Sequence, residues 1–150
     1  MYNAMDVANY IVNKSIKIDS PVSNLKLQKL LYYVQAAALV DGGCESGMFK
    51  DNISAWKYGP VVEVVYHKFK IYANASLKTD GSIVENCIKE EHKELIDKVI
   101  DAYKDVGAVD LVRKTHNEDP WKDAYDRRAN YINLDEIKTY YSKNRELLYA

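Results

Sequence analysis

SNLKLQKLLYYVQAAALV, residues 23–40, predicts the strongest helix of the chain. Its apolar side chains recur at helical spacing and form a stripe broad enough for a helix at the centre of a domain. Ser23 is well placed to cap the first turn, and Gly42-Gly43 follows the last one. We therefore predict that the remaining elements pack around this helix.

Weaker periodic segments lie on both sides of it, and none is separated by a linker that would split the chain. We predict a mainly α fold, a compact single domain over residues 1–150 with a small β-hairpin insert. The hairpin would pair 48–49 with 53–56, through a turn at 50–52. Residues 73–86 are predicted to be irregular, with a turn at 78–82. Further helices are predicted at 4–18, 60–72, 89–103, 108–116, 120–127 and 134–144.

Composition disfavours several classes of function. The 150 residues carry a net charge of −1 and no basic run longer than Arg127-Arg128, so nucleic acid is not expected as a direct partner. Cys44 and Cys87 stand alone, which indicates reduced thiols in the cytoplasm and neither a disulfide framework nor a zinc site. No signal peptide, membrane span, metal site or cofactor motif is apparent.

Two aromatic segments stand out, AWKYGPV at 55–61 and THNEDPW at 115–121, because they hold both tryptophans. Gly59-Pro60 would turn a strand into a helix, with Pro60 in its first turn. Asp119 would cap a helix that begins at Pro120, and Trp121 would then pack inward. Trp56 and Trp121 either share a core or form a recognition surface, and composition does not choose between these.

Polar groups on the central helix have two interpretations. Gln28 and Gln35 lie seven residues apart on one face beside Tyr32. By default Gln28 would bond the hairpin backbone; otherwise it lines a contact groove. The 13 tyrosines, against 2 phenylalanines, suit either the rim of a small core or a contact surface.

The case for an enzyme depends on His116, whose neighbours Glu118 and Asp119 could support acid or base chemistry. None of the common nucleophile, phosphate-binding or metalloprotease motifs accompanies it. A structural role is therefore preferred, with His116 at a helix end pairing with carbonyls or an acid. His92 is expected at the core or its rim, and His67 on the surface.

Three motifs in order carry a resemblance: residues 23–35, the segment 55–61 with Tyr66, and residues 116–121. The chain resembles the Panacea domain, the SocA-like antitoxin family, also labelled phage-associated protein. Order and spacing agree from about Val7 to the final helix. Asn117 stands where members often carry Ser, and 73–91 is the segment least like the family.

The resemblance implies an antitoxin that neutralises a cognate protein toxin by direct binding, and that has no enzymatic activity. Toxins of the family are chemically diverse, and the archetypal member also delivers its toxin to a host protease. The alternatives are a phage-borne inhibitor of a host defence protein, or a small hydrolase or nuclease using His116 and Asp119. Because a basic patch is missing, an acidic surface facing a basic toxin is one electrostatic option.

Within this framework the residues divide into two sets. The expected partner contacts are at the hairpin and on the exposed part of the central helix, namely Lys29, Tyr33, Lys57 and Tyr58. The expected structural residues are Gln28, Trp56, Gly59, Pro60, His116, Asp119, Pro120 and Trp121. The sequence gives no indication of the oligomeric state.

Overall fold

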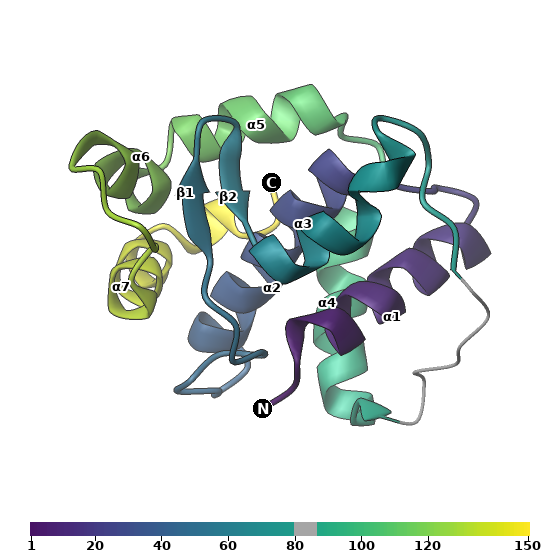
Figure 1. The fold of residues 1–150 in the computed structure, drawn as a ribbon. Coiled ribbons are helices and arrows are strands. Elements are labelled where there is room, and N and C mark those ends of the chain that lie inside the picture. The colour runs from purple at the N-terminus through teal and green to yellow at the C-terminus, as the bar shows by residue number, and fades with distance from the viewer. Residues whose placement is uncertain (80–86) are drawn as a thin grey trace.

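Helix α2 (Asn24–Val40) is the central element of the protein, as its apolar stripe predicts (Figure 1). In the computed structural model, which describes residues 1–79 and 87–150, every α2 residue except Leu25 and Val40 is buried. The Ser23 hydroxyl accepts the Lys26 N–H at 3.2 Å, which confirms the predicted cap. Past the helix, Gly43 adopts a φ of +64°, a conformation that glycine enters without steric cost.

The other helices pack around α2 and leave little of it accessible. Helices α4, α5 and α7 contact it, as do α1, α3 and strand β2. Figure 1 shows α5 along the top of the molecule, α6 and α7 at its left, and α1 beside α4. The bounds are α1 Ala4–Lys17, α3 Glu63–Phe69, α4 Glu90–Tyr103, α5 Ala108–His116, α6 Asp119–Asp126 and α7 Leu134–Lys143, with short 3₁₀ turns at Lys70–Tyr72 and Arg145–Leu147. The mainly α prediction is confirmed.

The hairpin exists, but its predicted pairing is wrong. Strand β1 (Ser54–Trp56) pairs antiparallel with β2 (Gly59–Val61), so Lys57 and Tyr58 form the turn. Pro60 therefore lies in a strand and not in the first turn of α3, which begins at Glu63. Proline has no N–H to donate, and an edge strand tolerates it as well as a helix start does.

The segment that was predicted to be the first strand has a different partner. Phe49 forms an isolated parallel bridge with Tyr2, near the N-terminus. Gln35 on α2 fixes this region, since its Oε1 accepts the N–H of Met48 at 2.7 Å and its Nε2 donates to the Phe49 carbonyl at 2.9 Å. The buried amide thus replaces the ladder bonds that a hairpin would have made.

Residues 73–79 contain no helix or strand, in agreement with the prediction for this stretch. They are nevertheless attached to the core, because Leu77 is buried and donates its N–H to the Val22 carbonyl at 2.8 Å. The turn predicted at 78–82 falls partly on 80–86, outside the described residues.

Candidate binding groove

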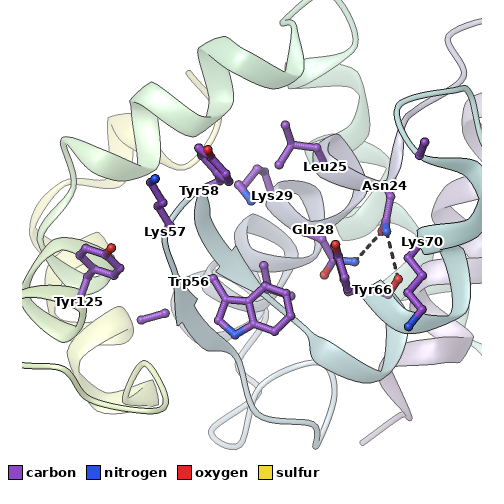
Figure 2. Close-up of a pocket in the computed structure, with 13 residues that line it drawn as sticks. Asn24, Leu25, Gln28, Lys29, Trp56, Lys57, Tyr58, Tyr66, Lys70 and Tyr125 are labelled. Atoms are coloured by element: carbon purple, nitrogen blue, oxygen red, sulfur yellow. Dashed lines mark hydrogen bonds between the residues drawn. The ribbon is translucent and has the colours of Figure 1, made fainter.

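A groove with a volume of about 610 Å³ lies between the hairpin, the first half of α2 and α3. Figure 2 shows it with Trp56 at the centre, Tyr125 and Lys57 on one side, and Asn24, Tyr66 and Lys70 on the other. Its size is that of a site for a few side chains or a small ligand. The lining residues are Asn24, Leu25, Gln28, Lys29, Ala55, Trp56, Lys57, Tyr58, Val61, Tyr66, Lys70, Ala73 and Tyr125.

The aromatic wall of the groove is held in place by the second tryptophan. Trp56 contacts the Tyr66 ring edge to face, with centroids 5.0 Å apart. The buried Trp121 donates its indole N–H to the Trp56 carbonyl at 2.8 Å, so α6 fixes the strand that carries the wall. The two tryptophans therefore divide the roles left open by the sequence: Trp121 belongs to the core and half-buried Trp56 to the groove.

Polar residues of α2 set the shape of the groove. Gln28 accepts the N–H of Val62 at 2.9 Å, one residue past strand β2 and so beyond the hairpin in which its partner was expected, and donates to Asn24 Oδ1 at 2.9 Å. Asn24 in turn donates to the Tyr66 carbonyl at 3.1 Å (Figure 2). Because these amides are satisfied within the protein, their cost of burial is met and they can hold the hairpin and α3 in register.

Lys29 is completely buried, so the prediction that it lies on the exposed part of the helix is wrong. Its ammonium donates to the Pro60 carbonyl at 3.2 Å, and no ion pair among the described residues includes it. Burial lowers the pKa of Lys29 from 10.5 to about 7. Gly59 leaves room for the lysine, since a Cβ there would lie 2.7 Å from Lys29 Cε.

The hairpin turn carries the exposed side chains of the site. Tyr58 is 61% exposed, and Lys57 and Lys70 are exposed as well. The Lys57 ammonium lies 5.6 Å from the centroid of the Tyr58 ring. These positions agree with the expected accessibility of Lys57 and Tyr58, while contact with a partner remains a prediction.

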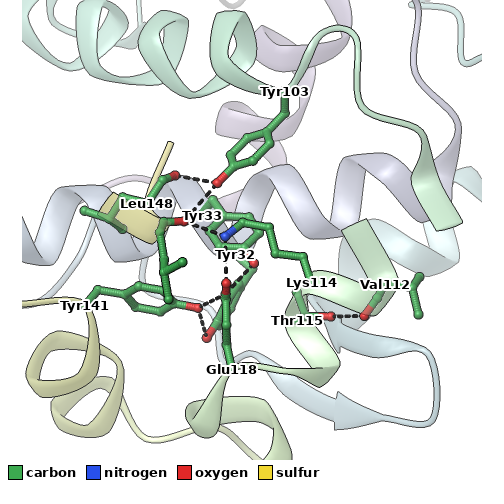
Figure 3. Close-up of polar contacts among 10 residues, drawn as sticks. Tyr32, Tyr33, Tyr103, Val112, Lys114, Thr115, Glu118, Tyr141 and Leu148 are labelled. Carbon is green, nitrogen blue, oxygen red and sulfur yellow. Dashed lines mark hydrogen bonds and ion pairs between the residues drawn. The ribbon is translucent and has the colours of Figure 1, made fainter. Parts of the chain in front are cut away.

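Tyr33 lies elsewhere, in a buried polar cluster, so its predicted exposure is also wrong. Its hydroxyl and that of Tyr141 each donate to Glu118 Oε1 at 2.6 Å, and Lys114 pairs with Oε2 at 2.6 Å (Figure 3). Burial raises the pKa of both tyrosines, so both hydroxyls stay protonated and can donate to the carboxylate. Lys114 also donates to the Leu147 carbonyl at 2.6 Å, so the cluster anchors the last segment of the chain.

Among the described residues no hydrogen bond or ion pair joins His116 to Asp119, the two residues named for the enzymatic alternative. His116 ends α5 as expected and makes a hydrogen bond with the Lys57 backbone, while its ring stacks on Trp121 with centroids 3.9 Å apart. Burial and the nearby Lys29 charge lower its pKa, and its Nε2 is buried without a partner in the described part of the chain. Asp119 is exposed and is the first residue of α6, so it does not cap this helix as predicted. Glu118 occupies the N-cap position, and its carboxylate accepts hydrogen bonds within the buried cluster.

The remaining histidines lie where the sequence placed them. His92, half-buried, accepts or donates a 2.6 Å bond with the Tyr2 hydroxyl, and His67 is exposed. Residues 1–79 and 87–150 contain no group of three or more His, Cys, Asp or Glu side chains placed to hold a metal ion. Within these described ranges no helix combines the length and apolar character needed to span a membrane.

The groove combines residues that sequence reasoning had named with residues that it had missed. Gln28, Lys29, Trp56, Lys57 and Tyr58 were named for the site or its frame. Asn24, Leu25 and Tyr66 were named only as part of the family motifs, and Lys70 and Tyr125 were not named. The signal for Tyr66, Lys70 and Tyr125 was weak because a lone polar or aromatic residue on a short helix or turn has several common roles.

Comparison with known proteins identifies a family and a similar antitoxin. The chain matches the family described as Antitoxin SocA-like, Panacea domain, over residues 27–122. It is 36% identical over 132 residues to Antitoxin SocA of Caulobacter vibrioides (strain NA1000 / CB15N), covering 79% of this chain and 68% of that protein. The DNA-directed RNA polymerase subunit beta' of Lotus japonicus is 30% identical over 88 residues, 57% of this chain but 12% of that protein. No solved structure matches. This chain therefore belongs to the SocA-like antitoxin family, defined by the Panacea domain.

Proposed function

We propose that this protein is an antitoxin that neutralises a cognate protein toxin by binding it directly at the groove. The observation that carries the proposal is that two family motifs, far apart in the chain, supply most of the lining: the first half of α2 and the segment around Trp56. Family membership supports the antitoxin role, and the groove offers a surface for it.

The chemistry of the groove suits recognition of a protein. Tyr58 projects from a hairpin whose backbone is fixed at several points, so little entropy is lost when a partner orders it. Aromatic side chains in such a position carry much of the energy of protein interfaces. We expect Tyr58 and Trp56 to be the principal contacts, with Lys57 at the rim.

The hydrolase alternative receives less support. A general base needs a nitrogen that can reach a substrate proton, and the free Nε2 of His116 is buried against Trp121. Inhibition of a host defence protein would use the same groove and differs only in the target.

A co-expression experiment tests the proposal. The product of the gene adjacent to this one is induced in bacteria with and without this protein, and the tagged protein is then purified. Relief of growth arrest and recovery of a stable complex are expected. The absence of both toxicity and a complex would contradict the antitoxin role and direct attention to a host target.

Point variants locate the interface in that complex. Tyr58→Ala and Lys57→Glu are expected to weaken the complex, whereas Tyr131→Ala is the matched control, since Tyr131 is 50% exposed and does not line the groove. Unchanged affinity of the first two variants would exclude the hairpin as the contact.

Delivery of the toxin to a host protease, as in the archetypal member, is a separable step of the proposal. It predicts that this protein shortens the half-life of the toxin in cells that contain the protease. A half-life that is unchanged while growth is rescued would limit the function to neutralisation by binding.

A further inference from the structure

The charge of the groove differs from that of the protein as a whole. The chain has a net charge of −1, yet the only Lys, Arg, Asp, Glu or His side chains among the groove residues are Lys29, Lys57 and Lys70. Two exposed ammonium groups, Lys57 and Lys70, and the buried amine of Lys29 thus line one largely aromatic site. This local charge is opposite to the acidic surface that composition had suggested as an option.

The buried lysine makes the charge distribution more specific. Lys29 has a single hydrogen-bond partner among the described residues, the neutral Pro60 carbonyl, and no carboxylate lies within ion-pair distance of it. A buried ammonium without a counter-charge is costly, and a negative charge brought into the adjoining groove would relieve that cost. Coulomb interactions are also stronger beside a low-dielectric wall than at an open surface.

Apolar surface surrounds these charges on several sides. The centroids of the Trp56 and Tyr66 rings lie 5.0 Å apart in an edge-to-face contact, and Leu25, Val61 and Tyr125 add further apolar surface to the lining. A ligand that fits therefore needs an apolar or aromatic side chain for the wall and a carboxylate for the lysines. A purely basic segment would meet like charges at this site.

We infer that the groove receives a segment of the toxin in which an aromatic or aliphatic side chain is flanked by Asp or Glu. The inference rests on the proposed function, because it takes a protein toxin as the occupant. The side chain packs against Trp56, and the carboxylates lie between the exposed Lys57 and Lys70, near the buried charge of Lys29. Lys57 and Lys70 guide association, and Lys29 selects for negative charge inside the groove.

Charge reversal in the complex tests the inference. The double variant Lys57→Glu/Lys70→Glu is expected to weaken binding of the adjacent gene product about tenfold or more and to abolish the loss of affinity with added salt. Lys138→Glu is the matched control, because Lys138 is exposed on α7 and does not line the groove. A complex that tolerates the double variant as well as the control would overturn the inference while leaving the antitoxin role intact.

A second measurement does not depend on the toxin. The synthetic peptide Ac-Glu-Phe-Asp-NH₂ is titrated into the protein and compared with the amide-matched Ac-Gln-Phe-Asn-NH₂, while the indole N–H resonance of Trp56 is followed by NMR. Preferential perturbation by the acidic peptide, lost in Lys29→Met, is expected. Equal perturbation by both peptides, or none by either, would overturn the inference. If the acidic peptide binds but no toxin is found, the proposed function fails and the chemistry of the groove remains.

Discussion

Replacing the buried lysine by methionine is predicted to stabilise the free protein. Lys29→Met keeps an unbranched side chain, one atom shorter than lysine, and removes the charge. Lowering the pKa from 10.5 to about 7, a shift of about 3.5, corresponds to a cost of about 5 kcal/mol for keeping the lysine protonated in the native state. Loss of the bond to the Pro60 carbonyl offsets about 1–3 kcal/mol of that gain. We expect Lys29→Met to be more stable than the wild type by about 2–4 kcal/mol at pH 7.

The pH dependence of the stability difference between the wild type and Lys29→Met tests the charge of Lys29 more directly than its size at one pH. Between pH 7 and 9 the unfolded chain holds the lysine proton almost fully, whereas the native protein releases it above about pH 7. The unfolded state thus binds more protons, so stability from this group rises with pH and is lost as pH falls toward 7. The wild type should gain about 2 kcal/mol relative to Lys29→Met between pH 7 and pH 9. His116, whose pKa is lowered from 6.5, stays neutral over this range.

Urea unfolding of both proteins at pH 7, 8 and 9 measures the effect, with the exposed Lys138→Met as the control for loss of a surface charge. Titration of groups distant from Lys29 contributes equally to the two proteins and cancels in the difference. A difference in the free energy of unfolding that is constant from pH 7 to pH 9 would refute the reasoning, since Lys29 would then carry no charge penalty in the native state.

Three further substitutions probe the frame of the groove and the buried cluster. Gly59→Ala is expected to lower stability by about 2–4 kcal/mol in thermal unfolding, because its φ of +111° and the tight contact with the buried lysine both oppose a Cβ; a loss below about 0.5 kcal/mol would contradict this. Glu118→Gln leaves Lys114 without its counter-charge and should cost about 3–5 kcal/mol in urea unfolding, so near wild-type stability would show that the cluster is not charged. Gln28→Met removes the acceptor of the Val62 N–H, for an expected loss of about 1–3 kcal/mol and faster hydrogen exchange of that amide; unchanged exchange would exclude the bond as a restraint on the hairpin.

The sequence predicted those elements whose signal is local. The central helix, its Ser23 cap and its end before Gly43 follow from spacing and cap residues within a few positions. A buried amide on such a helix needs a backbone partner, as expected for Gln28, but that partner is Val62, one residue past strand β2.

The features that the sequence did not reveal depend on distant partners. Pro60 suits an edge strand and a helix start equally well, so only the pairing of Trp56 with Gly59 decides between them. Lys29 and Tyr33 lie opposite the strongest apolar stripe and were taken for surface residues. They are buried because strand β2 and helices α4, α5 and α7 cover the rest of α2, and Glu118, 85 positions along the chain, accepts the Tyr33 proton.

The hydrogen bonds around the hairpin fix the backbone of its strands and leave the side chains of its turn, Lys57 and Tyr58, free of the core. Gln28 accepts the Val62 N–H, Lys29 donates to the Pro60 carbonyl, and Trp121 donates to the Trp56 carbonyl. Lys57 and Tyr58, in contrast, project into solvent. Substitutions at the two tip positions can therefore change which surfaces the protein fits without weakening the domain beneath. New partners would be acquired at this turn by single steps, each starting from a fully folded antitoxin.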